Sequence, residues 1–233
     1  MTLVLWDIDR TLLYTGDIDR QVYSELFEEV VGRPAEHLPA RGTGVTMPLA
    51  VRELLRVNTV EPSRIEELAQ EIVQRMPGQL GSHHDDIVRT GEVMPGAAAA
   101  LAAVHQRPDF LPTVVTGNLR GSAEIKLKAL GLDKYLDLAT GGYASDNSHR
   151  PALVRVAQQR SGVRYRCNFT RETTVIIGDS LEDVRTGREG GASVIAVASG
   201  TTSSYDLAAA GAHHVIPDLT DPQHLLELIA QCV

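Results

Sequence analysis

Two aspartates spaced two residues apart follow the first apolar segment of the chain. Residues 2–6 predict a buried strand, and Asp7, Asp9 and Thr11 come directly after it. Residues two apart on an extended chain share a face, so both carboxylates would point to one place, with the Thr11 hydroxyl close behind. Neighbouring carboxylates raise one another's pKa and need a proton or a cation between them. The oxygen ligands favour a hard ion such as Mg²⁺ over zinc.

Two later predicted strands also end in polar residues. The apolar run 111–115 leads into Thr116, Gly117 and Asn118, and the run 173–177 leads into Gly178, Asp179 and Asp183. In an open parallel sheet, ligands bind beyond the carboxyl ends of the strands, where the strand order reverses. Any one of these clusters alone would be typical of a helix N-cap or a turn. Three of them together predict a common site.

Strand and helix patterns alternate over most of the chain. Apolar residues recurring every three to four positions predict helices at 17–32, 48–56, 64–75, 97–105, 122–130, 151–161 and 204–210, another leading to residue 190, and a last one from 222. Weaker or shorter strands are predicted at 136–140, 193–198 and 214–216. Strands alternating with helices indicate crossover connections and therefore an α/β fold with a doubly wound parallel sheet.

The segment 16–88 is expected to differ from the rest of the chain. It contains helical patterns and loops but no convincing strand, and Pro77-Gly78 is expected to end the helix 64–75. Because it lies between the first predicted strand and the others, we interpret it as a small α-helical cap domain inserted in the first crossover. Residues 1–15 and 89–233 would then form the α/β core domain.

Composition excludes several classes of protein. Hydrophobic residues make up 43% of the 233 residues and charged residues 22%, which is ordinary for a folded globular protein. A net charge of −8 argues against a general nucleic-acid binder or a protein of anionic membrane surfaces. No apolar run approaches the roughly 18 to 20 residues that cross a bilayer. With two distant cysteines, Cys167 and Cys232, and no basic segment preceding an apolar stretch, we expect a cytoplasmic protein.

At its polar strand ends the chain resembles the haloacid dehalogenase superfamily. Asp7-Ile8-Asp9-Arg10-Thr11 is similar to the DxDx(T/V) signature of that family, Thr116 to its second motif, and the stretch from Gly178 to Asp183 to its GDxxxD-type fourth motif. The resemblance covers most of the chain in the right order and is greatest to small-metabolite phosphatases of the phosphoglycolate phosphatase kind. It implies a Rossmannoid core with a helical cap between the first and second motifs.

The resemblance also implies roles for the residues. Asp7 would be the nucleophile that forms an aspartyl-phosphate. Asp9 would be the general acid that protonates the leaving alcohol and then the base that activates water. Mg²⁺ would be bound by the Asp7 carboxylate, the Asp9 backbone carbonyl and Asp179, with Asp183 orienting its waters.

The phosphate would be held by the second motif. Thr116 and the backbone amides of Gly117 and Asn118 would contact its oxygens, and Thr11 is expected on the same side.

Two positions depart from the family pattern. Arg10 stands where relatives commonly have glycine, which would alter the local turn or contact the substrate. The third motif usually supplies a lysine, and two residues compete for its role. Arg150, followed by Pro151, occupies the corresponding place, whereas Lys126 lies on the helix after the second motif. We favour Lys126, because an ammonium is the more usual point charge at a phosphate.

Two further segments carry chemistry-bearing side chains. The loop containing Arg41 and Thr43 resembles the place where relatives position residues of substrate specificity, so both are candidates for substrate contact. The alternative for Arg41 is an exposed loop side chain, which is typical of arginine. His83, His84, Asp85 and Asp86 have a metal-like composition, but adjacent side chains diverge. We therefore interpret 83–86 as a polar hinge where the cap returns to the core.

The pattern as a whole predicts a Mg²⁺-dependent phosphomonoesterase that acts on a small phosphorylated metabolite, as a monomer or homodimer. One alternative is a sugar phosphomutase of the same fold, which would return the phosphoryl group to a sugar. Another is a noncatalytic phosphate-binding module similar to a receiver domain, although a cap insert would cover the face that a receiver needs for its partner.

Overall fold

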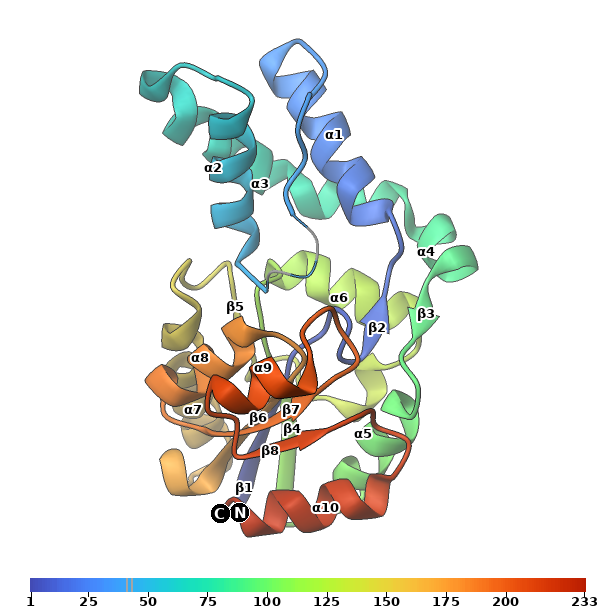
Figure 1. Ribbon diagram of the computed structural model, residues 1–233, viewed down its shortest axis with the longest axis vertical. Coiled ribbons are helices and arrows are strands. Elements are labelled where there is room, and N and C mark those ends of the chain that lie inside the picture. The colour runs from blue at the N-terminus through green and yellow to red at the C-terminus, as the bar shows by residue number, and fades with distance from the viewer. Residues whose placement is uncertain (41, 43) are drawn as a thin grey trace.

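A parallel β-sheet forms the centre of the protein in a computed structural model, which describes all residues except 41 and 43 (Figure 1). Six strands in the described residues follow the order β5-β4-β1-β6-β7-β8, and each neighbouring pair is parallel. Their bounds are Thr2–Trp6 (β1), Phe110–Thr116 (β4), Gly142–Tyr143 (β5), Thr174–Gly178 (β6), Ser193–Val197 (β7) and His214–Ile216 (β8). The chain proceeds outward from β1 first through β4 and then through β6, so the strand order reverses at β1. The predicted doubly wound α/β fold is confirmed.

Helices connect the strands and cover both faces of the sheet. The described helices are α1 (Ile18–Val31), α2 (Met47–Val57), α3 (Ile65–Ser82), α4 (His84–Thr90), α5 (Ala97–His105), α6 (Arg120–Ala129), α7 (Arg150–Tyr165), α8 (Leu181–Gly190), α9 (Ser204–Ala209) and α10 (Pro222–Gln231). The described residues also form three short 3₁₀ helices, η1 (Pro62–Arg64), η2 (Asp133–Tyr135) and η3 (Arg171–Thr173).

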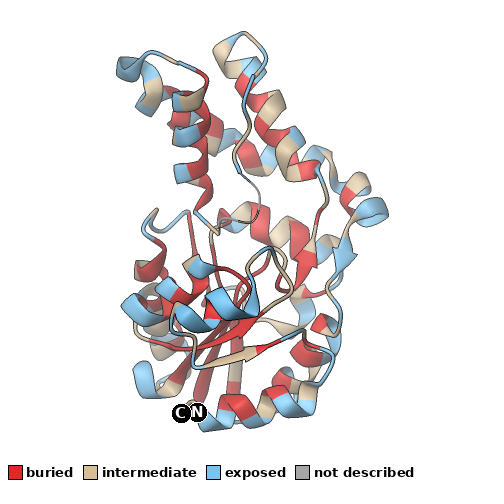
Figure 2. Cartoon of the chain, in the orientation of Figure 1, coloured by how far each residue is buried: buried red, intermediate tan, exposed pale blue. Residues whose placement is uncertain are grey.

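The strand β1 is buried on both faces, as Figure 2 shows for the centre of the sheet. Successive side chains of a strand point to opposite faces. Val4 and Trp6 belong to the hydrophobic cluster that includes residues of α5 and α10, whereas Leu3 and Leu5 belong to the cluster that includes residues of α7, α8 and α9. Burying each such side chain contributes about 1.5–3 kcal/mol. This burial explains the continuous apolar run. It also fixes the position of the end of β1.

The helices α1, α2 and α3 lie beyond the carboxyl ends of the central strands (Figure 1). Their buried faces share a second hydrophobic cluster, centred on residues such as Leu26, Leu54 and Ile72. No strand lies between residues 16 and 88 among those described, as expected. The division of the chain into cap and core at these residues stays a prediction, and its carboxyl boundary falls inside α4.

A small antiparallel sheet joins the two segments that connect these helices to the core. It pairs β2 (Leu13–Tyr14) with β3 (Glu92–Val93), and the amide of Met94 donates to the carbonyl of Leu12 at 2.9 Å. Neither strand is predicted from the sequence, because two-residue strands carry no periodicity. The pairing fixes where the chain leaves and re-enters the core.

The helix α3 continues through Pro77, so the predicted end before this proline was wrong. Proline removes one backbone hydrogen bond inside a helix and disfavours it. Burial on both sides of the proline overrides this preference, because Met76 and Leu80 are only 1% and 2% exposed. Pro77 also packs closely against Gly121 of α6, where an added Cβ would lie 3.0 Å from the proline ring.

The predicted strand 136–140 was also wrong. The backbone turns back on itself there, since the amide of Thr140 donates to the carbonyl of Asp137. The edge strand β5 forms at Gly142–Tyr143 instead, beside Val115 and Thr116. An added Cβ at Gly142 would collide with the backbone of α7, so only glycine fits at this close approach.

None of the helices in the described part of the chain combines the length and the apolar character needed to cross a bilayer.

Candidate active site

A cavity lies at the carboxyl ends of the three central strands, between them and the helices above. Asp7 follows the last residue of β1, Thr116 is the last residue of β4, and Asp179 follows the last residue of β6. All three line the cavity, and residues of α1 and α2 line its other side. The reversal of strand order at β1 leaves this space between the crossovers, as parallel sheets of this type do.

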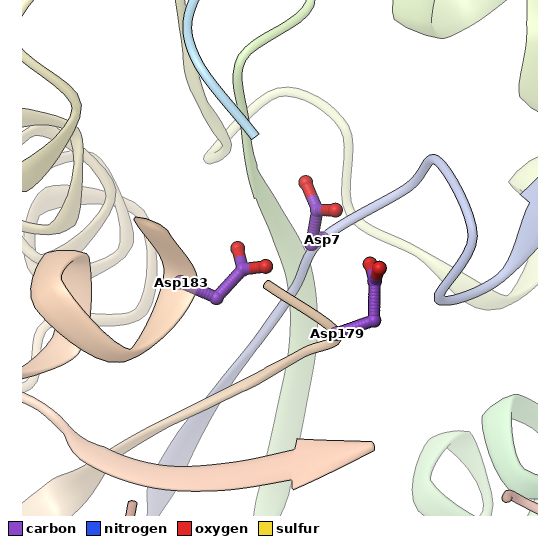
Figure 3. A group of neighbouring side chains, drawn as sticks. All are labelled: Asp7, Asp179 and Asp183. Carbon is purple, nitrogen blue, oxygen red and sulfur yellow. The ribbon is translucent and has the colours of Figure 1, made fainter. Parts of the chain in front are cut away.

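The residues Asp7, Asp179 and Asp183 form a buried acidic trio (Figure 3). Each offers a carboxylate oxygen, and these oxygens lie within 4.8 Å of one another. Asp7 and Asp179 come from strand ends, whereas Asp183 comes from the first turn of α8. Their oxygen-only donor set and burial are suitable for a hard divalent cation.

Burial and the repulsion from neighbouring carboxylates disfavour the ionised forms of Asp7 and Asp179. Burial, and next the nearby Asp183, raise the pKa of Asp7 well above its usual range, although Arg150 opposes the shift. The same two causes raise the pKa of Asp179 to about 7. Such shifts are expected where several anions share a site that a cation would stabilise.

Arg150 is the first residue of α7 and lies almost completely buried against the trio. Its Nη2 donates to Asp7 Oδ1 at 2.6 Å and also to Asp183 Oδ1, and its Nη1 donates to the backbone carbonyl of Gly44. Burial works against the charged guanidinium, but Asp183 and Asp7 outweigh it and raise the pKa of Arg150. The guanidinium is therefore charged and compensates one of the three carboxylates.

Local hydrogen bonds orient the other two acids. The Thr11 hydroxyl donates to Asp179 Oδ1 at 2.9 Å. Ser180 is the N-cap of α8, and its backbone amide and hydroxyl donate to Asp183 Oδ2 at 2.9 and 2.6 Å. Thr11, expected at the phosphate, is fully buried and is not among the described residues that line the cavity. Its hydroxyl orients Asp179 instead.

The Asp9 carboxylate belongs to a separate group of polar residues, which includes Asp19 of α1. Lys126 Nζ donates to Asp9 Oδ1 at 2.8 Å, and Asn118 Nδ2 donates to Asp9 Oδ2 at 2.7 Å. The structure thus separates the two aspartates of the first motif. Asp7 faces the acidic trio, and the Asp9 side chain faces a cation and an amide.

Lys126 is fully buried in the helix α6. Besides Asp9, it donates to Asp19 Oδ2 at 2.7 Å and to Asn118 Oδ1 at 3.0 Å. Burial works against the charged ammonium, but Asp19 and Asp9 outweigh it and raise the pKa of Lys126. The structure therefore places Arg150 beside Asp7 and Lys126 beside Asp9.

The second motif also lines the cavity, through Thr116, Gly117 and Asn118. Thr116 is completely buried, and its hydroxyl accepts hydrogen bonds from the backbone amide and the side-chain amide of Asn118. The Gly117 carbonyl accepts from the amide of Met47 at 2.8 Å. An added Cβ at Gly117 would lie 2.7 Å from the carbonyl of Val45, so glycine permits the close approach of this segment.

Arg10 adopts a left-handed backbone conformation, with φ of 64°. This conformation costs a non-glycine residue about 1–2 kcal/mol and explains why glycine would suit the position. The Arg10 side chain lies over the Tyr14 ring, 4.6 Å from its centre, and both residues line the cavity. The Ser199 hydroxyl donates to the Arg10 carbonyl at 2.7 Å and holds the turn.

The other expected segments are placed as follows. Arg41 and Thr43 lie outside the described residues. His83 contacts Glu25 of α1 at 2.8 Å, at the junction of α3 and α4, and is not among the described residues around the cavity. Asp19, which lines the cavity, is not among the residues predicted from the sequence. The position of Asp19 in the first turn of a predicted helix gave no signal beyond that of an ordinary helix-start carboxylate.

Comparison with known proteins finds one matching family and several proteins of similar sequence or structure. The sequence pattern of the haloacid dehalogenase-like hydrolases matches residues 4–188. A phosphoglycolate phosphatase of Cupriavidus necator is 27% identical over 225 residues, which cover 94% of this chain and 90% of that protein. The pyrophosphatase PpaX of Listeria monocytogenes is 22% identical over 193 residues, 81% of this chain and 79% of that protein. The crystal structure of a hydrolase from Pseudomonas syringae has a TM-score of 0.72 at 21% identity and covers 98% of this chain and 99% of its own.

Proposed function

Because the chain belongs to the haloacid dehalogenase-like hydrolases, we propose that it is a Mg²⁺-dependent phosphatase acting on a small phosphorylated metabolite. The reaction would pass through an aspartyl-phosphate on Asp7. The observation that carries this proposal is the convergence of Asp7, Asp9 and Asp179 from two strand ends on one cavity. The phosphatase relatives described above support the same reaction class.

Asp7 is suited to act as the nucleophile. Its carboxylate is held at one oxygen by Arg150 Nη2, and the residue lines the cavity. Attack on phosphorus would form a bond from an Asp7 oxygen and break the bond to the leaving oxygen, so that one difficult displacement is divided into two easier ones. Water would then displace phosphate from Asp7.

Asp9 is suited to move the protons of both steps. Its carboxylate is the more exposed of the two, with 38% of the side chain accessible, and both of its oxygens are oriented by hydrogen bonds. It would protonate the leaving alcohol and then remove a proton from the attacking water. Thr116 and Gly117 border the same space and would contact the phosphate oxygens.

The acidic trio fits a magnesium ion. Its three carboxylates face a single guanidinium among the described residues, that of Arg150, so two negative charges remain uncompensated when all these groups are ionised. Asp7 and Asp179 would be ligands, and Asp183, held by Ser180 and Arg150, would lie behind them. When bound, Mg²⁺ would neutralise this charge and that of the transferring phosphoryl group.

Release of phosphate from p-nitrophenyl phosphate tests the proposal. We expect activity that requires Mg²⁺, is abolished by EDTA and returns when Mg²⁺ is restored. Asp7→Asn should lower kcat by at least about 10³-fold, since the nucleophile is lost, and Asp9→Asn by about 10²–10⁴-fold. Exposed Glu28 on α1 provides the control, because Glu28→Gln should leave the rate unchanged.

Other outcomes would lead to different conclusions. Equal background rates in the wild type and the Asp7→Asn variant would contradict the phosphatase assignment and favour a noncatalytic binding module. Transfer of the phosphoryl group to a sugar without net release of phosphate would indicate a phosphomutase. A panel of phosphorylated acids, sugars and nucleotides would then identify the substrate.

A further inference from the structure

The ammonium of Lys126 has no hydrogen-bonding capacity left for a substrate. An ammonium has three N–H donors. In the structure they are directed at Asp9 Oδ1, Asp19 Oδ2 and Asn118 Oδ1, at 2.8, 2.7 and 3.0 Å. The side chain is also completely buried. Lys126 is therefore suited to hold other side chains in place, and not to bind a phosphate directly.

Lys126 fixes Asp9 in two ways. It donates directly to Asp9 Oδ1, and it donates to the carbonyl oxygen of the Asn118 amide. The second contact orients that amide so that its nitrogen faces Asp9 Oδ2, to which it donates at 2.7 Å. Both oxygens of a partly exposed carboxylate are thereby held, although the carboxylate could otherwise rotate within the cavity.

Asp19 completes the arrangement from the cap side. It lies in the first turn of α1, and the Thr15 hydroxyl donates to the same Oδ2 atom that accepts from Lys126, at 2.9 Å. The first turn of a helix is also a favourable place for an acidic side chain, because the helix dipole is positive at that end. Without Asp19, the buried ammonium would retain one carboxylate partner among the described residues, Asp9, and one of its N–H groups would lose its acceptor.

We propose that Asp19 is a positioning residue, which fixes Lys126 so that Lys126 and Asn118 hold the Asp9 carboxylate in the orientation that proton transfer requires. The inference rests on the proposed function and deepens it. Asp19 belongs to α1 and Lys126 to α6, so Asp9 is fully held only while α1 lies against the core. The contact between Asp19 and Lys126 thus links the position of α1 to the orientation of the Asp9 carboxylate.

Leaving groups of different basicity test this role. Phenyl phosphate and p-nitrophenyl phosphate have similar shapes, but only the phenolate of the first depends strongly on protonation as it leaves. We expect Asp19→Asn to lower kcat/KM at least about tenfold for phenyl phosphate, part of the 10²–10⁴ that general acid catalysis supplies, and less than about threefold for p-nitrophenyl phosphate. Glu28→Gln on the same helix is the matched control and should change neither value.

A merely structural role would give a different pattern. If Asp19→Asn lowered both values equally, or neither, the inference would be overturned. A double variant adds an independent criterion, because a residue that acts through Asp9 has no further effect once Asp9 is replaced. Asp9→Asn and the combined Asp9→Asn, Asp19→Asn variant should therefore have the same rate on phenyl phosphate, and a further loss in the double variant would contradict the inference.

Failure of the proposed function can be distinguished from failure of this inference. If the wild type released phosphate from neither ester, the phosphatase proposal would fail, and crystal structures would decide the positioning role. We expect the Asp9 carboxylate to contact both Lys126 and Asn118 in the wild type but to lose at least one of these contacts in Asp19→Asn. If the Asp9 carboxylate kept both contacts in the variant, the inference would be overturned. Thermal unfolding of each variant checks that the fold is retained.

Discussion

Each of the two aspartates of the first motif contacts a different buried cation. Arg150 contacts Asp7 and Asp183, and Lys126 contacts Asp9 and Asp19. From the sequence we favoured Lys126 for the third-motif role, on the ground that a point charge is usual there. The contacts support Arg150 instead, because its guanidinium contacts Asp7, the proposed nucleophile, whereas the three donors of Lys126 are directed at Asp9, Asp19 and Asn118.

The three contacts of Arg150 predict that lysine cannot replace it. Arg150→Lys keeps the positive charge but loses the forked donors, so one or more of Asp7, Asp183 and Gly44 would lose its partner. We expect kcat to fall by about 10–100-fold, in line with the loss of about 1.5–3 kcal/mol for a hydrogen bond to a charged group. Steady-state kinetics with p-nitrophenyl phosphate measure the effect.

An exposed arginine on the same helix offers the control. Arg155→Lys should leave kcat unchanged, since Arg155 is exposed on α7. If Arg150→Lys kept the wild-type kcat while Lys126→Ala abolished turnover, the assignment of the third-motif role to Arg150 would be wrong.

At the scale of elements, the start of α2 and the residues before it line the cavity, and we call Gly44, Val45, Thr46 and Met47 the strap. Thr46 Oγ1 donates to the Ser148 carbonyl at 2.9 Å, and the Met47 amide donates to the Gly117 carbonyl. Gly44 has φ of 69° and accepts from Arg150. The strap therefore contacts the second motif and the start of α7 at the same time.

We predict that a methyl group at Gly44 displaces the strap. An added Cβ would lie 2.9 Å from Glu182 Cβ and would also collide with the Ser180 hydroxyl. Gly44→Ala should therefore lower kcat/KM by at least about tenfold, because close placement of the groups around a substrate is worth several kcal/mol.

A variant at Gly32 distinguishes displacement of the strap from the effect of backbone strain. It also has a positive φ, 84°, but an added Cβ would meet nothing within 4 Å. Gly32→Ala should lower the free energy of unfolding by about 1 kcal/mol without changing kcat/KM. Equal kinetics in both variants would show that the strap does not shape the site.

At the scale of the whole molecule, the acidic site makes stability depend on pH and metal. The pKa of Asp179 is raised to about 7 in the folded protein from an ordinary value of 3.8. Between these values the folded protein binds more protons than the unfolded chain, so stability is present at low pH and is lost as the pH rises toward 7. Without metal, this carboxyl alone would lower the free energy of unfolding by up to about 4 kcal/mol across that window.

Thermal unfolding in EDTA and in Mg²⁺ checks this prediction. In EDTA, Tm should fall between about pH 5 and pH 7. A metal that binds the ionised trio stabilises the folded state by mass action, so Mg²⁺ should raise Tm most at the upper end of that range. Asp179→Asn should reduce both the pH dependence and the response to Mg²⁺. A Tm in EDTA that rises steadily over this range would contradict the predicted sign.

The sequence by itself determined the layered α/β fold, the order of β1, β4, β6, β7 and β8 along the chain, and the polar residues at three strand ends. These features follow from local rules, because an apolar run of five residues such as 2–6 must be buried and its period fixes which side chains share a face. Only the tertiary structure decided that α3 continues through Pro77, that the edge strand lies at Gly142, and that Asp19 reaches Lys126. Each depends on contacts between residues far apart in the chain, where burial and charge compensation outweigh local preference.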